Sequence, residues 1–181
     1  MVGIGKGDYN YCKNFWEGIK MLLQMEIFKD KNEMFAHMDS ALAAMIKRRD
    51  DVVSSLANAS ALIKMYLEDA NWIGFYLFRE ERLVLGPFQG NPAVTRIKLG
   101  DGVCGEAARR KRTIRVDDVT TCTNYIECDA SSASEIVIPM VNRDRLLGVL
   151  DIDSPISARF DHIDEHGLEK IVSSLVRLIY L

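Results

Sequence analysis

Two cysteines of this chain have neighbours that are typical of reactive thiols. Cys128 lies in the stretch YIECDASSASEIVIPM (residues 125–140), between two acids in a loop rich in serine and alanine. A structural thiol usually sits among apolar residues, and this loop offers none next to Cys128. Cys104, in LGDGVCGEAARR, stands between glycines where we expect a helix to begin, and the backbone N–H groups of a helix start stabilise a thiolate. Packing beneath the helix is the other interpretation of Cys104, and the residues leave both open.

Three acids form a second set of residues with chemical potential. Asp151 and Asp153, in GVLDIDSP, are two residues apart at the end of an apolar strand, so both point to one face if the strand continues that far. Glu135 opens another expected strand and adds a third carboxyl group. Carboxylates at close range raise at least one pKa, which leaves an acid able to donate a proton near neutral pH. The alternative is a solvated strand end, with Asp153 capping the Ser-Pro turn.

The histidines match no familiar metal motif. His162 and His166 share a helix face by their spacing, but the sequence lacks HExxH, and its cysteines lack close C-x-x-C pairing. We therefore expect no metal site. Asp161 and Asp164, beside these histidines, are interpreted as part of a solvated first helical turn.

Composition and charge narrow the class of protein. At 181 residues and 48% hydrophobic, the chain fits one globular domain with its own core. A net charge of −3 gives no field that attracts nucleic acid or an anionic membrane, and the basic run at 109–112 is expected to be a solvated helix face. Without a signal peptide or a membrane-spanning run, the protein is expected to be soluble and cytoplasmic. Its thiols should then stay reduced, and Cys12 and Cys122, which no motif frames, are interpreted as incidental.

The N-terminal third is predicted to be helical. Residues 9–28 carry apolar side chains at helical spacing, which suggests an amphipathic helix and divides the chain into an N-terminal helical extension (1–30) and a main domain (31–181). Two helices should follow, one with Asn32 as its N-cap and one that starts at the acidic pair 50–51.

The rest of the chain alternates short strands with two helices. The strands expected are WIGFYLF, RLVLGPF, TRIKL, TIRV, EIVIPMV and RLLGVLDID. A short helix from Val103 should precede TIRV, and a closing helix should run from about Ile163 to Tyr180. This order predicts an α+β fold with a central antiparallel sheet flanked by helices. The irregular region 117–134 is long, and loops of that length are usually functional or disordered.

Five motifs, in this order, resemble the free methionine-R-sulfoxide reductases built on the GAF domain. They are NASALIKMYLEDANWIGFYLF, LVLGPFQG, GDGVCGEAA, ECDASSASEIVIPM and LLGVLDIDS, and the resemblance covers about residues 30–178. It implies a GAF-like sheet flanked by helices and the reduction of free methionine-(R)-sulfoxide in a closed pocket. It implies no bound cofactor but an external dithiol reductant such as thioredoxin. Homodimers are frequent among the proteins that this chain resembles.

The resemblance also implies roles for the thiols. Cys128 would be the nucleophile and Cys104 a resolving cysteine. Many members of the family carry another cysteine just before the strand that matches TRIKL, where this sequence has Val94. The sulfenic acid on Cys128 could therefore be attacked directly by Cys104, by Cys122 in its place, or by an external thiol. We rank Cys104 first.

The same resemblance implies a pocket for the substrate. Glu135, Asp151 and Asp153 would line its sulfoxide end, Trp72 would hold the methyl group, and Tyr76 would contribute to the wall. For Trp72, a role in the core alone is the competing interpretation. Two rival functions remain: a GAF-type ligand-binding or redox-sensing module without turnover, and a thiol peroxidase, in which the three acids would have no obvious role.

Overall fold

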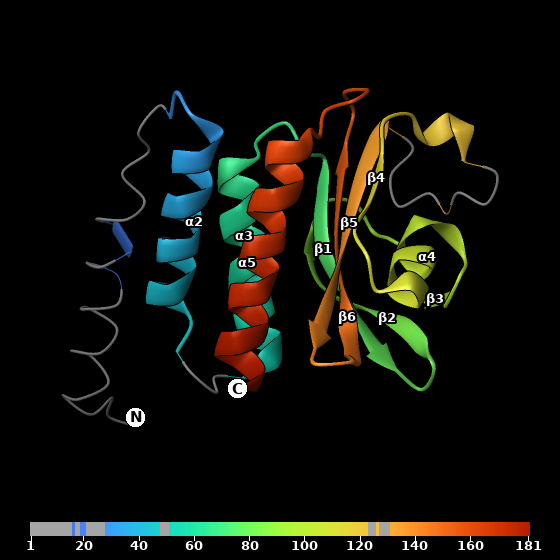
Figure 1. Cartoon of the computed structure of the whole chain (residues 1–181), viewed down its shortest axis with the longest axis horizontal. Coiled ribbons are helices and arrows are strands. Elements are labelled where there is room, and N and C mark those ends of the chain that lie inside the picture. Colours follow the sequence, from blue (N-terminus) through green and yellow to red (C-terminus); the bar gives the residue numbers. More distant parts are fainter. Residues whose placement is uncertain (1–15, 17–18, 21–27, 48–50, 123–125, 127–130) are drawn as a thin grey trace, which may run out of the picture.

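The structure is a computed structural model that describes residues 16, 19–20, 28–47, 51–122, 126 and 131–181. Its elements in chain order are α2 (Lys31–Met45), α3 (Val52–Tyr66), β1 (Trp72–Arg79), β2 (Arg82–Gln89), β3 (Arg96–Lys98), α4 (Gly102–Arg110), β4 (Ile114–Val116), the 3₁₀ turn η1 (Val119–Thr121), β5 (Ser134–Asn142), β6 (Arg145–Ser154) and α5 (His162–Tyr180). The strands form one antiparallel sheet in the order β3-β2-β1-β6-β5-β4. Helices α2, α3 and α5 lie on one side of this sheet and α4 on the other (Figure 1). The predicted α+β class and the antiparallel sheet are confirmed.

The two helices that precede the sheet begin at aspartate caps. The side chain of Asp30 accepts a hydrogen bond from the backbone N–H of Asn32 (2.8 Å), so the prediction of Asn32 as the cap of α2 is wrong by two residues. Asp51 accepts from the backbone N–H of Ser54 (2.9 Å) and starts α3, as the acidic pair predicted.

The structure describes only a few residues of the predicted N-terminal extension. Trp16, Ile19 and Lys20 have helical backbone, and Ile19 is buried. The other residues before Phe28 lie outside the described part of the chain, so the boundary at residue 30 stays a prediction. Among the described residues, no helix has the length and apolar character needed to cross a bilayer.

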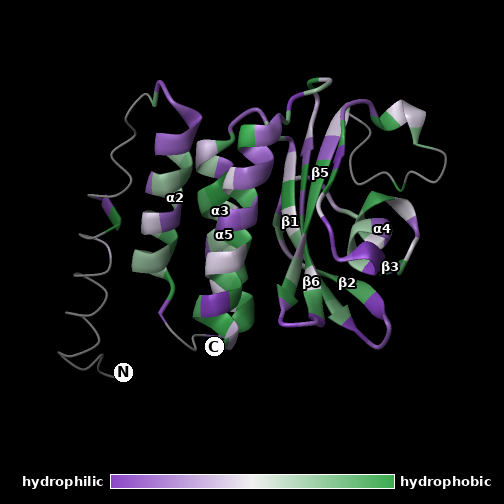
Figure 2. Cartoon of the chain, viewed as in Figure 1, coloured by the Kyte–Doolittle hydropathy of each residue, from purple (hydrophilic) through white to green (hydrophobic). Residues whose placement is uncertain are grey.

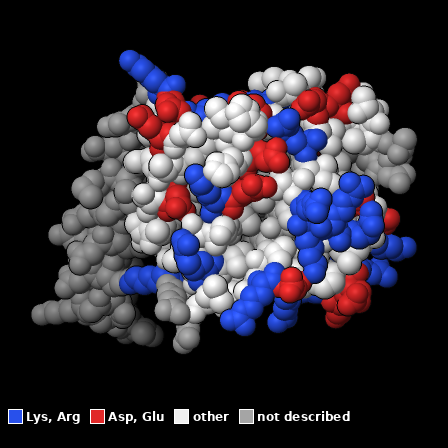
Figure 3. All heavy atoms as spheres, in the orientation of Figure 1, with Lys and Arg blue, Asp and Glu red and all other residues white. Residues whose placement is uncertain are grey.

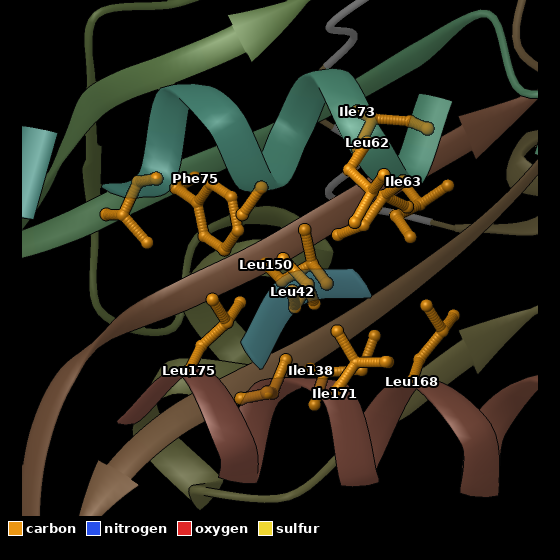
Figure 4. Close-up of a cluster of buried hydrophobic side chains, with 14 of the residues drawn as sticks. Leu42, Leu62, Ile63, Ile73, Phe75, Ile138, Leu150, Leu168, Ile171 and Leu175 are labelled. Atoms are coloured by element: carbon orange, nitrogen blue, oxygen red, sulfur yellow. The ribbon is translucent and has the colours of Figure 1, made fainter. Parts of the chain in front are cut away.

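The strand alternation divides the buried residues into two layers. On β6, Leu150 and Ile152 face the three-helix side, whereas Val149 lies in the cluster on the α4 side. Figure 4 shows α5 side chains such as Ile171 pointing toward Leu150 and its neighbours. The central strands β1 and β6 are largely hydrophobic in Figure 2, because both of their faces are covered. The helix side thus supplies the main core and leaves the α4 side for a site.

An ion-pair network joins the helices of the main core. Asp164 is fully buried, and its carboxylate accepts hydrogen bonds from Lys31 on α2 (2.6 Å) and from Arg159 (3.0 Å). Arg159 also pairs with Asp69, in the connection between α3 and β1. Asp161 caps α5 and binds the same lysine (2.8 Å). The interpretation of Asp164 as part of a solvated turn is therefore wrong, because this residue is buried and paired with Arg159 and with Lys31 from a distant helix.

Candidate active site

The floor of the candidate site is a row of side chains across three strands. In the sheet register, Asp153 on β6 is opposite Trp72 on β1 and opposite Glu135 on β5. Asp151, two residues earlier on the same face, is opposite Gly74 and Val137. Neighbours in such positions have Cβ atoms about 5 Å apart. The prediction that Asp151 and Asp153 share one face is confirmed, since β6 continues to Ser154.

Helix α4 covers this floor and brings a thiol to it. Cys104 is only 3% exposed, and its sulfur lies with one carboxylate oxygen of Glu135 and one of Asp151 in a group whose members are all within 4.8 Å of one another. Gly105 allows α4 to pack closely against the end of β3, because a Cβ at that position would lie 2.3 Å from the carbonyl oxygen of Lys98. The absence of a side chain at Gly105 therefore lets the start of α4 pack against the end of β3 and the turn that follows it.

Burial decides the electrostatics of the acid cluster. Glu135, Asp151 and Asp153 are at most 4% exposed, so the interpretation as a solvated strand end is wrong. Burial raises the pKa of Glu135 well above its ordinary value, and the charges of Asp151 and Asp153, a hydrogen bond with Asp151 and the proximity of Cys122 raise that pKa further. The raised pKa favours the protonated form of Glu135, and this carboxyl group lies next to the Cys104 thiol.

Two aromatic residues stand beside the acids. The indole of Trp72 is fully buried, stacks on the ring of Tyr76 (centroids 6.0 Å apart) and donates its N–H to the carbonyl oxygen of Asn91 (3.0 Å). The Tyr76 hydroxyl donates to the carbonyl oxygen of Val94 (3.0 Å). A Cβ on Gly74 would lie 2.4 Å from the Trp72 ring, so the ring lies over Gly74, the cross-strand neighbour of Asp151.

Sequence reasoning missed Phe88, which forms the other side of this aromatic group. Its ring stacks on Trp72 with centroids 5.4 Å apart and planes inclined by 14°. The signal was present in the quoted LGPFQG stretch, but a strand pattern does not show which ring lies against Trp72 until the pairing of β1 with β2 is known.

Cys122 also belongs to this region, contrary to its interpretation as incidental. It follows η1, is half-buried and is close enough to Glu135 to raise the pKa of that carboxyl group. It also lines a surface cavity of about 680 Å³ that includes Val103, Arg110 and Arg115. Cys122 therefore borders both the acid cluster and the surface.

The surface around α4 is basic. The residues of the run 109–112 are exposed, as predicted, and Arg109 and Arg110 pair with Glu106 (2.6 and 2.5 Å). These pairs lower the pKa of Glu106 to about 2. In Figure 3, Lys and Arg side chains gather on the α4 side of the visible face.

Cys128, the nucleophile that the resemblance implied, lies outside the described residues. Its neighbour Ile126 is described and lies against the start of α4, where a Cβ on Gly102 would come within 3.1 Å of it. The described part of the site therefore comprises the Cys104 thiol, the three acids, the aromatic wall and Cys122.

The fold and the site define the class. Residues 48–179 match the family model of the GAF domain, and the chain belongs to that family. Within it, the chain is a member of the group of free methionine-R-sulfoxide reductases, the name that two of its curated relatives and several of its structural neighbours carry.

Three comparisons carry this assignment. The chain is 43% identical over 150 residues to the free methionine-R-sulfoxide reductase of Escherichia coli K12, which covers 83% of this chain and 91% of the relative. It is 46% identical over 127 residues to the enzyme of that name from Saccharomyces cerevisiae, covering 66% of this chain and 71% of the relative. The crystal structure of the Neisseria meningitidis free methionine-R-sulfoxide reductase in complex with its substrate superposes with a TM-score of 0.75 at 38% identity, covering 82% of this chain and 87% of that one.

Proposed function

We propose that this protein reduces free methionine-(R)-sulfoxide to methionine with electrons from an external dithiol such as thioredoxin. The observation that carries the proposal is the convergence of the Cys104 thiol with the Glu135 and Asp151 carboxyl groups, whose atoms lie within 4.8 Å of one another and whose side chains are all buried. The similarity to enzymes that bear this activity in their names supports the same conclusion.

The first step consumes the sulfoxide. The Cys128 thiol attacks the sulfoxide sulfur and forms a sulfur–sulfur bond with it, while the sulfur–oxygen bond breaks and the protonated oxygen departs as water. Water then attacks the Cys128 sulfur, the sulfur–sulfur bond breaks with its electron pair on the methionine sulfur, and the products are methionine and a Cys128 sulfenic acid. The oxygen must be protonated as it leaves, because a bare oxide is a poor leaving group. Glu135 suits this task, since burial and the neighbouring carboxylates raise its pKa and keep it protonated.

The second step restores the thiol. A second cysteine attacks the sulfenic acid, a disulfide forms, and water leaves. Cys104 takes this role in our proposal, since its sulfur already lies at the acid cluster. The external dithiol then reduces the disulfide and is itself oxidised to a disulfide. Cys122 is the second candidate for this role, because it borders both Glu135 and the surface cavity.

The aromatic wall fits the other end of the substrate. Trp72, stacked between Tyr76 and Phe88, presents a fixed apolar surface next to the acids. Such a surface suits a small S-methyl group, and the hydrogen bonds from Trp72 to Asn91 and from Tyr76 to Val94 prevent the rings from moving apart.

The test is a turnover assay on purified protein. With dithiothreitol or thioredoxin as reductant, we expect consumption of free methionine-(R)-sulfoxide, little consumption of the S epimer, and no turnover in Cys128→Ser. Cys104→Ser should still form one methionine per chain in a single turnover without reductant but should slow steady-state turnover. Binding of methionine without any turnover would instead identify a sensor module, and full turnover in Cys128→Ser would overturn the assignment of the nucleophile.

A further inference from the structure

Three possible metal-ligand atoms meet at the acid cluster, and they come from three separate elements of the fold. The Cys104 sulfur comes from α4, and the carboxylate oxygens come from Glu135 on β5 and Asp151 on β6. These three atoms lie within 4.8 Å of one another, and the three residues are at most 4% exposed. The expectation of no metal site rested on linear motifs, which do not register donors that three separate elements bring together.

One of these residues, Glu135, also has a buried oxygen, Oε2, without a hydrogen-bond partner among the described residues. A buried carboxylate oxygen without a partner carries a desolvation cost of about 1–3 kcal/mol, which a cation or a proton would offset. This observation is independent of the clustering of the three donors.

We propose that Cys104, Glu135 and Asp151 form a binding site for a thiophilic divalent ion, with zinc as the best match. One thiolate and two carboxylates are ligands that zinc accepts, and three protein ligands leave a fourth tetrahedral position open. Magnesium and calcium prefer six or more oxygen ligands, so the sulfur and the small number of donors exclude them. The group has the donor types of a transition-metal site.

The three donor atoms need to move only slightly closer together to coordinate zinc. With zinc–sulfur and zinc–oxygen bonds of about 2.3 and 2.1 Å, the donor atoms of a tetrahedral site lie roughly 3.4–3.6 Å apart. The donors lie within 4.8 Å of one another, so a contraction of about 1 Å is sufficient. Rotation of the Glu135 and Cys104 side chains supplies a movement of this size without a change in the sheet register.

The negative charge of the ionised carboxyl groups favours the replacement of their protons by a zinc ion. Glu135 and Asp151 lie beside Asp153, and among the described residues the thiols of Cys104 and Cys122 border this cluster. With every carboxyl group ionised, the pocket would carry a buried charge of about −3, which protons or a cation must neutralise. Zinc binding displaces protons from the thiol and the carboxyl groups and supplies the compensating charge.

Two consequences follow for the molecule. The ion connects α4 to the two strands β5 and β6, so it should raise the melting temperature of the folded chain. It also occupies the sulfoxide end of the pocket, so zinc-bound protein should not accept the substrate. The second consequence depends on the proposed function, but the binding itself does not.

The experiment measures zinc binding in the full chain with competing donors removed. The background variant carries Cys12→Ser and Cys128→Ser, so that Cys104 and Cys122 are its only thiols, together with His162→Ala and His166→Ala, which remove the exposed histidine pair. Equilibrium dialysis against zinc should give one tightly bound ion per chain. Cobalt in place of zinc should produce a sulfur-to-cobalt charge-transfer band in the near ultraviolet.

Two further substitutions in this background decide the assignment. Cys104→Ser should abolish the cobalt band and weaken zinc binding by at least about tenfold, and Asp151→Asn should weaken binding while the band remains. Cys122→Ser is the matched control and should leave both the band and the affinity unchanged. The proposal is wrong if Cys104→Ser binds zinc like the background, or if Cys122→Ser removes the band. None of these measurements uses the sulfoxide, so failure here leaves the proposed function untouched, and the reverse holds as well.

Discussion

At the scale of single residues, the acid cluster governs both chemistry and stability. Glu135 is buried against Asp151 and Asp153, and these neighbours raise its pKa above the ordinary value of 4.5. A carboxyl group kept protonated in this way donates a proton to a leaving oxygen, as the proposed reaction requires. The same arrangement destabilises the folded protein, because ionisation of Glu135 in this pocket is unfavourable.

The Glu135→Gln variant should separate these two effects. Turnover should fall by about 10²–10⁴-fold, because the amide cannot act as a general acid. Stability should change in the opposite direction. Between 4.5 and the raised pKa, folded protein retains a proton that the unfolded chain has released, so the free energy of unfolding decreases as pH rises through this window. Glutamine does not titrate, so the variant should be more stable than the parent above the window, and this advantage should disappear below about pH 4.5.

Urea unfolding across this pH range, together with the turnover assay, tests the prediction. Glu33→Gln, an exposed residue in the first turn of α2, serves as the control and should change neither quantity. An advantage of Glu135→Gln that persists unchanged at acid pH would contradict the argument, since it would then come from packing and not from ionisation.

At the scale of elements, α4 is the part of the fold that completes the site. It carries Cys104, and its close contact with the turn after β3 depends on the absence of a side chain at Gly105. In a helix exposed to solvent, replacing glycine by alanine stabilises by about 1 kcal/mol. Here the sign should reverse, because the new Cβ would lie 2.3 Å from a backbone oxygen, which cannot rotate away.

Gly105→Ala should therefore destabilise the protein by about 1–3 kcal/mol and reduce turnover, because α4 must move and takes Cys104 with it. Arg110→Ala, exposed on the same helix, is the matched control and should change stability by less than about 1 kcal/mol. Thermal unfolding and steady-state kinetics of the two variants provide the comparison. A Gly105→Ala protein as active and stable as its parent would show that α4 adapts without moving the thiol.

At the scale of the whole molecule, stability and chemistry occupy opposite faces of one sheet. The helix side holds the larger core and the ion-pair network at Asp164, whereas the α4 side holds the acids, the thiols and the aromatic wall. The alternation of side chains along β6 makes this division, since Leu150 and Asp151 are adjacent but face opposite layers.

Asp164→Asn should therefore lower the stability of the folded protein and leave its catalytic activity nearly unchanged. Loss of the buried carboxylate leaves Lys31 and Arg159 without their common partner, so the free energy of unfolding should fall by about 3 kcal/mol or more. The value of kcat/KM, measured well below the melting temperature, should stay within about twofold of the parent, since the ion-pair partners of Asp164 are Lys31 and Arg159, and neither belongs to the candidate site. Glu165→Gln, which removes only the exposed pair with Arg115 (3.3 Å), should cost at most about 1 kcal/mol. A large loss of kcat/KM in folded Asp164→Asn would show that the two faces are coupled.

Sequence by itself determined the elements and their order, because alternation of apolar residues and capping acids are local properties. It also determined that Asp151 and Asp153 share a face, since this depends only on the period of a strand. The precise cap of α2 was missed because Asp30 and Asn32 are both good caps, and only the backbone geometry distinguishes them. The motifs, taken together, identified the family, which the comparisons confirmed.

Tertiary structure alone decided which of these residues meet. The burial of the three acids depends on α4 covering the sheet, and the place of Cys104 among them depends on a glycine contact with a turn. The position of Cys122 beside Glu135, the stacking of Phe88 on Trp72 and the pairing of the buried Asp164 with Lys31 are likewise contacts between separate segments. A side chain's own neighbours in the chain fix its direction, but its pKa and its partners depend on what the fold packs against it.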